Sequence, residues 1–340
     1  MEEAVSEAQK AIALDLLTRG KFKNRILVTD SADLAEKAGN GTPVEICGNP
    51  FHFGRSLRGI INKYKIARPF YVGGGFPLLS QQEMEGTAEL LRQGEDCVIA
   101  NNFYSADMVA FTPGSSIDRV ELPAKDNPLA RLLVEQAGLK FMPLVRSVSN
   151  QFDIDTPTDL LFLGLHPAWK DRVRGYLSLD DSRLKAAVAC FQDKNAEVIV
   201  FGRVNSYVWS RLETQTRCRI RLWAEERGLK SEGRLQNGKA KSLAGFLLEK
   251  TDFRSFFDML ARMGDAAFID SRVIFAHFGL SVSRKDRFNS DLGNFREIEN
   301  KFVRDFTRAS VEAPIPVVMG GHSLISGGML LLLELVADKL

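Results

Sequence analysis

The stretch Phe-Asp-Ile-Asp-Thr-Pro-Thr-Asp-Leu at residues 152–160 decides the fold expected for this chain. Asp153 and Asp155 stand at positions i and i+2, so on an extended segment their carboxylates point to the same side. Such a pair can hold a hard divalent cation such as Mg²⁺, and the cation can carry the phosphates of a nucleotide. Thr156 is a suitable helix cap, and Pro157 suits the first turn of the helix that follows. The competing interpretation is that both carboxylates only cap and turn the chain.

Upstream of this stretch, apolar runs and amphipathic runs alternate in the manner of a mostly parallel sheet with flanking helices. The pattern predicts helices over residues 2–19, 55–65, 81–92 and 128–136, and strands over 25–30, 44–47, 69–72, 97–100 and 108–112. Ser80 and Glu83 have the spacing of a capping box, and Gly20 is the expected stop of the first helix. The first half of the chain, residues 1–167, is therefore predicted to be an α/β domain.

This half resembles the nucleotidyltransferases that load a nucleotide onto a cofactor precursor. The enzymes of this group that it resembles are molybdenum-cofactor guanylyl- and cytidylyltransferases and 2-phospho-L-lactate guanylyltransferase. The resemblance rests on Gly75-Phe76-Pro77-Leu78-Leu79-Ser80 and on residues 153–160. It implies a nucleotide-diphospho-sugar transferase-like fold and transfer of a nucleotidyl group from a nucleoside triphosphate. Asp153 and Asp155 would then be the catalytic and Mg²⁺-binding residues.

The chain departs from that family at two places. It lacks the family's first strand and the Gly-Gly-rich loop that wraps the phosphates, and Gly75 stands where the family has a metal-binding Asp. Backbone N–H groups of Gly73, Gly74 and Gly75 can approach a phosphate, but they do not supply the charge of a carboxylate. A non-catalytic protein that binds a nucleotide or cofactor is therefore an alternative to a transferase.

Three further residues of the first half are candidates for nucleotide or substrate binding. Asp30 ends a predicted strand, where open α/β sheets bind ligands, although it also suits a turn before a helix. Asn101 and Asn102 follow another strand, and their amides can hold a base or an acceptor. A plain turn is the competing interpretation of the two asparagines.

The second half, residues 168–340, is predicted to be a separate α/β domain of unknown role. Strands are expected at 197–201, 219–224 and 315–319, and helices at 242–250, 253–263, 295–310 and from 329 onward. Asp270 before Ser271 and Arg272 has the pattern of a helix cap. The first half carries 17 Lys and Arg against 21 Asp and Glu, whereas the second carries 28 against 22. The basic second half suits an anionic ligand or an evenly solvated surface.

Two groups of residues in the second half are candidates for binding that anion. Arg203 follows a strand at a junction with a helix, and Arg219 and Arg221 share one face of the next strand. The second group, Gly320-Gly321-His322-Ser323, forms a glycine-rich turn between a strand and a very apolar helix. Such a turn aims N–H groups at an anion, and His322 can donate a proton or accept one. Close packing of the last helix is the alternative role of the glycines.

Composition excludes several classes of protein. Apolar residues make up 45% of the chain and charged residues 26%, as in ordinary globular proteins, and no apolar run is long enough to span a membrane. The four cysteines are far apart in the sequence, so neither a zinc site nor a disulfide framework is expected. With no visible signal peptide, a cytoplasmic location is expected. Nothing indicates a nucleic-acid or membrane partner, and the expected partners are a nucleotide and a phosphorylated small molecule.

Three functions remain open at this point. The chain is a nucleotidyltransferase that uses Mg²⁺ at Asp153 and Asp155, or it is a non-catalytic nucleotide- or cofactor-binding protein of the same fold. In the third alternative, the second half acts on a phosphorylated small molecule near Arg203 and His322.

Overall fold

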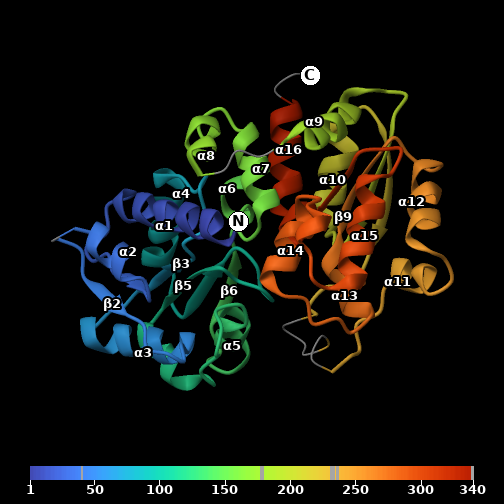
Figure 1. Ribbon diagram of the computed structural model, residues 1–340. Helices are drawn as coiled ribbons and strands as arrows, with labels where there is room; N and C mark the ends of the chain where they lie inside the picture. Colours follow the sequence, from blue (N-terminus) through green and yellow to red (C-terminus); the bar gives the residue numbers. More distant parts are fainter. Residues whose placement is uncertain (40, 177–179, 230–233, 235–236, 338–340) are drawn as a thin grey trace. The chain divides into compact units, whose positions relative to one another are not determined.

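The computed structural model describes residues 1–337 apart from residue 40 and residues 177–179, 230–233 and 235–236 (Figure 1). The chain divides into two compact units. The N-terminal unit is Gln9–Asn150, and the C-terminal unit joins Met1–Ala8 to Gln151–Leu340. Each unit combines helices with a four-stranded sheet, so the α/β class expected from the sequence is confirmed.

The division falls between Asn150 and Gln151, whereas the sequence placed the boundary at residue 167. The motif that contains Asp153 is hydrogen-bonded to the end of the chain, because the Thr158 hydroxyl donates to the Met319 carbonyl oxygen over 2.9 Å. The motif therefore belongs to the C-terminal unit, together with the helix α7 (Pro157–Leu165) that follows it.

The sheet of the N-terminal unit has the order β3-β5-β4-β6, and a separate pair of parallel strands, β1 and β2, accompanies it. The six strands are β1 (Leu27–Thr29), β2 (Val44–Ile46), β3 (Phe70–Val72), β4 (Cys97–Ala100), β5 (Met108–Thr112) and β6 (Lys140–Pro143). Strands β4 and β6 are parallel, whereas β5 runs antiparallel to both of its neighbours, which the sequence did not indicate. Strands β4 and β5 are buried along their whole length and form the centre of this core.

Helices cover both faces of this sheet. Residues of α3 and α5 pack with Val98 and Val109 on one face, and Leu91 of α4 packs with Ile99 on the other. The elements are α1 (Glu2–Thr18), α2 (Ala32–Lys37), α3 (Phe53–Tyr64), α4 (Gln81–Gln93), the 3-10 helix η1 (Gly114–Arg119), α5 (Leu129–Glu135) and α6 (Val148–Gln151). The capping box of α4 at Ser80 and Glu83 is present as expected. These helix positions follow the amphipathic pattern of the sequence closely.

All four strands of the C-terminal sheet are parallel, in the order β10-β9-β7-β8 (Figure 1). They are β7 (Glu197–Gly202), β8 (Arg219–Ala224), β9 (Ala266–Asp270) and β10 (Val317–Gly320). Every residue of β9 and β10 is buried, as is typical of strands covered by helices on both faces. Strand β9 is a central strand that the sequence analysis missed, because its five residues form a short apolar run without alternation.

Helices on both faces complete the core of the C-terminal unit. The aromatic residues Phe256 and Phe257 of α12 and Phe306 of α15 pack on one face of the sheet. The C-terminal helix α16 is almost entirely buried, as its apolar sequence predicted. The elements are α8 (Lys170–Tyr176), α9 (Ser182–Ala189), η2 (Cys190–Gln192), α10 (Ser206–Gln215), α11 (Leu243–Leu248), α12 (Phe253–Ala261), α13 (Ser271–His277), α14 (Arg284–Asp291), η3 (Phe295–Glu297), α15 (Lys301–Val311), η4 (Ser323–Ile325) and α16 (Gly327–Ala337).

The helix expected over residues 295–310 is interrupted. A 3-10 turn, η3, ends at Glu297, and α15 begins at Lys301 with Asn300 as its cap. The buried carboxylate of Asp286 accepts the backbone N–H groups of Glu299 and Asn300 at 3.0 and 2.9 Å. Those N–H groups are thereby satisfied outside a helix, and the chain turns before α15 starts.

The strand order creates a switch point between β7 and β9. From β7 the chain moves to β8 on one side, and it then returns to build β9 and β10 on the other side. Open parallel sheets bind ligands beyond the carboxyl ends of the strands at such a point. In this unit Gly202, Asp270 and Gly320 end the three strands that meet there.

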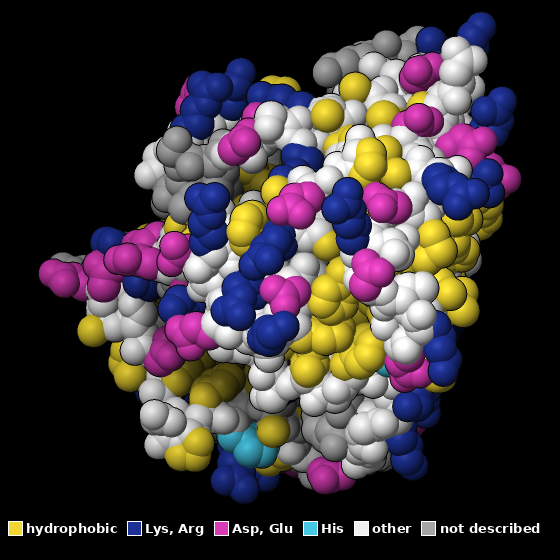
Figure 2. Space-filling model, turned by 45° about the vertical axis from the view of Figure 1, so that its right-hand side comes forward, with side chains coloured by type: hydrophobic (Ala, Val, Ile, Leu, Met, Phe, Trp, Pro, Cys, Tyr) yellow, Lys and Arg dark blue, Asp and Glu magenta, His cyan; other side chains and the backbone are white. Residues whose placement is uncertain are grey.

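No helix in the described part of the chain is long and apolar enough to cross a membrane. On the face shown in Figure 2, Lys and Arg side chains are interspersed with Asp and Glu side chains.

We expect Gly202→Ala to destabilise the protein strongly. Gly202 has a φ of 134°, and a Cβ there would lie 2.3 Å from the Cβ of Asp270. A forbidden φ combined with overpacking costs about 3 kcal/mol or more. Gly279→Ala is the matched control, because Gly279 also has a positive φ, of 63°, but no atom within 4 Å of the added Cβ. Urea unfolding of both variants measures the difference, and equal losses would contradict the steric argument.

Candidate functional site

A buried ion pair lies at the switch point of the C-terminal sheet. The Arg203 guanidinium donates from Nε to Asp270 Oδ2 over 2.6 Å and from a terminal nitrogen to Asp270 Oδ1 over 3.0 Å. The Asp270 side chain is fully buried, and the Arg203 side chain is 14% exposed. Gly202 permits this contact, because any side chain there would meet Asp270. The result is a bidentate pair that fixes the ends of β7 and β9 against each other.

Asp270 does not act as the helix cap that the sequence indicated. Its side chain makes no capping hydrogen bond to α13. Burial by itself would raise the pKa of this carboxyl group, but the charge and hydrogen bonds of Arg203 outweigh that effect and hold the pKa below its usual range. Asp270 is therefore an ionised partner of Arg203 and one of the residues that sequence analysis missed at this site.

The glycine-rich turn follows β10 and lies at the same edge. Gly320 pairs with Asp270 in the sheet, and Gly321 leads into the short helix η4. In the described part of the chain, the backbone N–H groups of Gly321 and His322 have no hydrogen-bond acceptor. A Cβ on Gly321 would approach no atom closer than Thr156 Cγ2, at 3.6 Å, so packing does not explain this glycine. Unpaired N–H groups after a parallel strand are suited to an anion.

The glycines at the start of α16 have a different role. A Cβ on Gly327 would lie 1.9 Å from the Gln151 carbonyl oxygen, and one on Gly328 would lie 2.6 Å from the Phe162 ring. Gly327 allows α16 to pack against the segment before α7, and Gly328 allows it to pack against α7 itself. The packing interpretation therefore holds for Gly327 and Gly328.

His322 is a neutral imidazole in this environment. Burial, and next the positive charge of Arg203, lower the pKa of His322 to about 3. A hydrogen bond between its ring and the backbone of Arg203 favours the protonated form and so raises the pKa, but this effect is smaller than the effect of burial. A neutral imidazole that donates one N–H to a carbonyl has its other nitrogen available as an acceptor.

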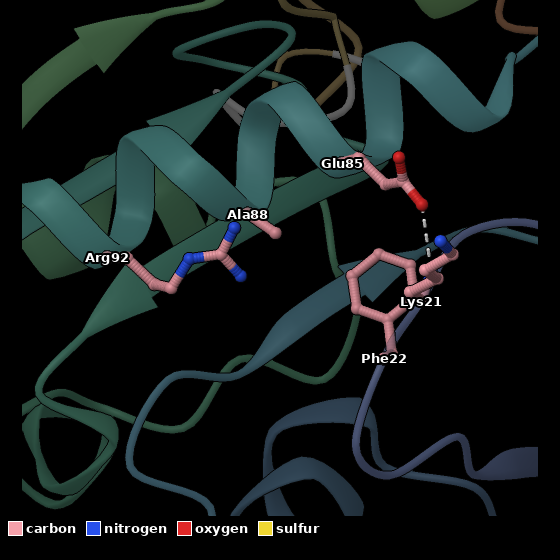
Figure 3. Close-up of a pocket in the computed structure, with 5 residues that line it drawn as sticks. All are labelled: Lys21, Phe22, Glu85, Ala88 and Arg92. Atoms are coloured by element: carbon pink, nitrogen blue, oxygen red, sulfur yellow. Dashed lines mark hydrogen bonds between the residues drawn. The ribbon is translucent and has the colours of Figure 1, made fainter.

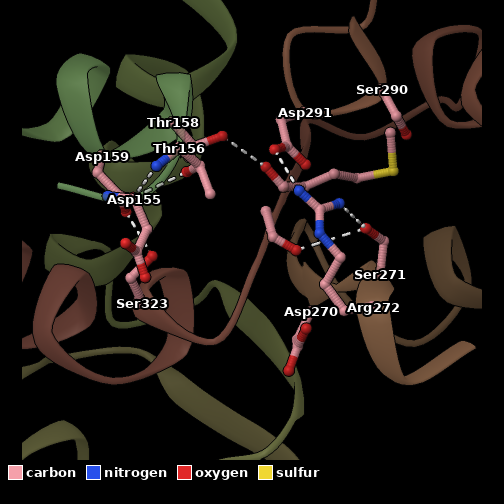
Figure 4. Close-up of polar contacts among 12 residues, drawn as sticks. Asp155, Thr156, Thr158, Asp159, Asp270, Ser271, Arg272, Ser290, Asp291 and Ser323 are labelled. Carbon is pink, nitrogen blue, oxygen red and sulfur yellow. Dashed lines mark hydrogen bonds and ion pairs between the residues drawn. The ribbon is translucent and has the colours of Figure 1, made fainter. Parts of the chain in front are cut away.

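The motif around Asp153 is connected to this turn through Asp159 (Figure 4). The Ser323 hydroxyl donates to Asp159 Oδ1 over 2.6 Å. Asp159 Oδ2 accepts the Thr156 N–H and hydroxyl, at 2.7 and 2.9 Å, and the Asp155 N–H at 3.0 Å. Thr156 and Asp159 thus form the capping box of α7, and the predicted helix start is confirmed. The motif and the glycine-rich turn share one polar network.

Asp159 is fully buried in that network. Burial raises its pKa to about 7, and the charge of Asp155 acts in the same direction. The hydroxyl of Ser323 and the donors of Thr156 and Asp155 oppose the rise. The carboxyl group is therefore held by four hydrogen bonds: three come from the neighbouring Thr156 and Asp155, and the tertiary structure adds the fourth, from Ser323.

Asp153 and Asp155 alternate with buried apolar neighbours. Phe152 and Ile154 are 0% exposed, Asp155 is exposed and Asp153 is partly buried. The expected alternation of an extended segment is therefore present. No group of three or more His, Cys, Asp or Glu side chains suited to a metal occurs among the described residues. Two carboxylates still fit Mg²⁺, because this ion commonly takes one or two carboxylates and fills its remaining positions with phosphates and water.

Arg219 and Arg221 lie at the opposite edge of the sheet. Arg219 begins β8 and pairs with Glu197 at the amino end of β7. Arg221 donates to the Glu197 carboxylate at 2.7 and 2.9 Å and is 47% exposed. These two arginines form a solvated strand edge and are not brought together with Arg203 and His322.

The candidates of the N-terminal unit gather at the carboxyl ends of β3 and β4. Gly73 N–H donates to the Asp107 carbonyl oxygen over 2.9 Å, and Asn101 follows β4, with β5 between the two strands. Asn101 Oδ1 accepts two backbone N–H groups, and Asn102 Oδ1 accepts two more in the turn that follows. The two amides thus support the backbone, as the turn interpretation predicts. Gly74 and Gly75 form the turn after Gly73, and Asp30 is exposed at the end of β1 in the separate strand pair.

A surface depression of about 230 Å³ lies elsewhere in the N-terminal unit (Figure 3). Its lining residues are Lys21, Phe22, Glu85, Ala88 and Arg92. Glu85 accepts the Lys21 N–H over 3.1 Å and the Gln81 amide over 3.0 Å, so its carboxylate is already engaged. None of the residues singled out in the sequence lines this depression, and its chemistry does not favour a particular ligand.

A second buried pair lies beside the first. Arg272, at the start of α13, donates to Asp291 Oδ2 over 2.5 Å and to the Ser271 hydroxyl over 3.0 Å (Figure 4). The Asp291 side chain is fully buried, and its Oδ1 atom has no hydrogen-bond partner among the described residues. Burial raises the pKa of Asp291 to about 6 despite the charge of Arg272. Sequence spacing gave no signal for this pair, because 18 residues separate its members.

Models of known protein families match no part of the sequence, and no curated protein matches it either.

We expect the neutral state of His322 to make the protein less stable in acid. The unfolded chain binds a proton on this histidine near pH 6.5, whereas the folded protein does so only near pH 3. Below pH 6.5 the unfolded chain takes up a proton that the folded protein does not bind. The free energy of unfolding therefore has its full value above pH 6.5 and decreases as the pH falls. Allowing for partial exposure, the loss between pH 7.5 and 5 is about 1–2 kcal/mol.

Unfolding free energies of wild type and His322→Gln at these two pH values measure that contribution. The variant should lose less stability than wild type on acidification. His52→Gln, which changes a helix cap in the N-terminal unit, is the control and should follow the wild-type pH dependence. Parallel pH profiles for wild type and His322→Gln would contradict the assignment.

Proposed function

We propose that this protein binds a phosphorylated small molecule of the nucleotide type at the carboxyl edge of its C-terminal sheet. The observation that carries the proposal is the turn Gly321–His322, whose unpaired backbone N–H groups follow β10 at the switch-point edge. Parallel sheets bind phosphates at such turns because the N–H groups of the turn converge on the anion.

The surroundings of the turn support an anionic ligand with hydroxyl groups. The Arg203–Asp270 pair holds the edge in place, so that binding requires little rearrangement. His322 is neutral, and its second ring nitrogen is available to accept a hydrogen bond from a hydroxyl group of the ligand. Ser323 ties the turn to the segment that carries Asp153 and Asp155.

Binding should be sensitive to a charge at Gly321. In Gly321→Asp the new side chain meets only ordinary contacts at its Cβ, and its carboxylate repels a phosphate. Because Gly321 is buried, thermal unfolding without ligand checks that the variant is folded. Calorimetric titration with ATP, GTP and CTP should show at least tenfold weaker binding of the preferred nucleotide. Gly175→Asp is the matched control, because Gly175 has open space around it and lies on α8. Equal affinity in Gly321→Asp and wild type would contradict the proposed site.

Nucleotidyl transfer is a second candidate function, favoured by Asp153 and Asp155 on the segment that Asp159 ties to the turn. In this reading the two carboxylates hold Mg²⁺, which neutralises the phosphates of a nucleoside triphosphate when bound. The chain's own contribution is to fix the direction of both carboxylates through buried Phe152 and Ile154.

The transferase candidate predicts that Mg²⁺ strengthens nucleotide binding. Titration of ATP, GTP and CTP with and without Mg²⁺ should show tighter binding with the metal, and Asp153→Asn with Asp155→Asn should abolish that difference. Asp171→Asn is the control, because the Asp171 side chain is 94% exposed on α8. Metal-independent binding that the double variant leaves unchanged would exclude the Mg²⁺ site while leaving nucleotide binding intact.

A further inference from the structure

The positive charges that act on the proposed site already have partners. Arg203 is paired with Asp270, and Arg272 is paired with Asp291, with both carboxylate side chains fully buried. The charge of Arg227 also acts on His322, but Arg227 already interacts with other residues, and His322 itself is neutral. A phosphate at this edge therefore needs a further cation, or it would face backbone N–H groups alone.

Arg287 on α14 is such a cation. Its side chain is partly buried, yet it forms no hydrogen bond or ion pair with any described residue. A guanidinium carries five N–H donors, and burying them without acceptors costs free energy. Neighbouring arginines in this unit are satisfied in other ways: Arg272 binds Asp291, and Arg284 lies over the Phe288 ring at 5.0 Å. Arg287 thus differs from both in lacking a partner.

The position of Arg287 on its helix places it next to the proposed site. Arg287 and Asp291 are four residues apart on α14 and therefore share one face, about 6 Å apart along the helix axis. Asp291 on that face reaches Arg272, which begins α13 directly after the end of β9. Arg287 therefore lies on the face of α14 that carries the contact to Arg272, one helical turn from Asp291.

The electrostatic surroundings of Arg287 lack a matching anion. Burial, and then the charges of Arg272 and Arg284, lower the pKa of the Arg287 guanidinium, and the opposite charges of Asp291 and Glu2 only partly offset them. Neither Asp291 nor Glu2 forms an ion pair with Arg287 in the described part of the chain. In the same neighbourhood, Asp291 Oδ1 is buried without a donor. Of these two features, the unpartnered guanidinium is the one expected of a polar site that is completed by an anionic ligand.

We propose that Arg287 is the residue that binds the phosphate group of the ligand at the carboxyl edge of the C-terminal sheet. This inference rests on the proposed function, and it assigns a positively charged residue to the proposed ligand site. The guanidinium donates two N–H groups to two phosphate oxygens, and the backbone N–H groups of Gly321 and His322 donate to the remaining phosphate oxygens. The ligand class is then a phosphate ester or diphosphate.

The experiment is a calorimetric titration of the full chain with inorganic pyrophosphate and with the nucleotide that wild type prefers. Arg287→Gln should weaken binding of both at least tenfold, and Arg287→Lys should recover part of the loss, because a lysine keeps the charge but not the bidentate geometry. Arg308→Gln is the matched control, since Arg308 is an exposed arginine of α15 near Asp305. It should bind like wild type.

Thermal unfolding without ligand separates binding from a structural role. Removing an unpartnered guanidinium that lies beside two like charges should leave the melting temperature of Arg287→Gln unchanged or raise it. A lower melting temperature together with unchanged affinity would assign Arg287 to the fold and overturn the inference. If wild type binds the nucleotide and Arg287→Gln binds it equally well, the inference fails and the proposed function stands. If wild type binds neither probe, the proposed function itself fails.

Discussion

The bidentate contact between Arg203 and Asp270 is the constraint on which the C-terminal unit depends. Both charges lie at the carboxyl ends of the two central strands, where burial disfavours them, and removing one partner of such a pair costs about 3–5 kcal/mol. The contact exists because Gly202 leaves room for it at the end of β7. It fixes the ends of two adjacent strands at the switch point, and the charge of Arg203 helps to keep His322 neutral. The edge proposed to bind a ligand is therefore held in its shape before any ligand arrives.

A second constraint joins segments that are far apart in the chain. Ser323 and Asp159 are 164 residues apart, yet their side chains share a hydrogen bond in a buried network with Thr156. A carboxyl group in such a place is stable only when its acceptor capacity is used, and here four donors reach it. The motif at residues 152–160 thus performs a structural task at Thr156 and Asp159. Asp153 and Asp155 alternate with buried residues along the same segment, and they are the carboxylates of the motif that are proposed to meet a ligand.

Local signals in the sequence predicted most elements where the determining contacts are local. The capping boxes at Ser80 and Thr156 depend on residues three apart, and the amphipathic and apolar runs fix the helices of the N-terminal unit and α16. Prediction failed where a distant residue decides the structure. Asp270 has the sequence pattern of a cap but binds Arg203, 67 residues away, and Asp286 interrupts the expected helix over 295–310 by binding backbone N–H groups. Strand β9 is too short to show the alternation of apolar and polar residues by which a strand is recognised in a sequence.

The sequence by itself determined the α/β class, the position of most helices and strands, and the glycine-rich turn after β10, because these follow from spacing and conformational preference within a few residues. Only the tertiary structure decided which polar residues meet. It united Arg203, Asp270 and His322 with the Asp153 motif, and it placed Arg219 and Arg221 at the opposite edge. It also left the Arg287 side chain without a hydrogen-bond or ion-pair partner among the described residues. The physical reason is that strand order, which no local pattern encodes, determines which strand ends become neighbours.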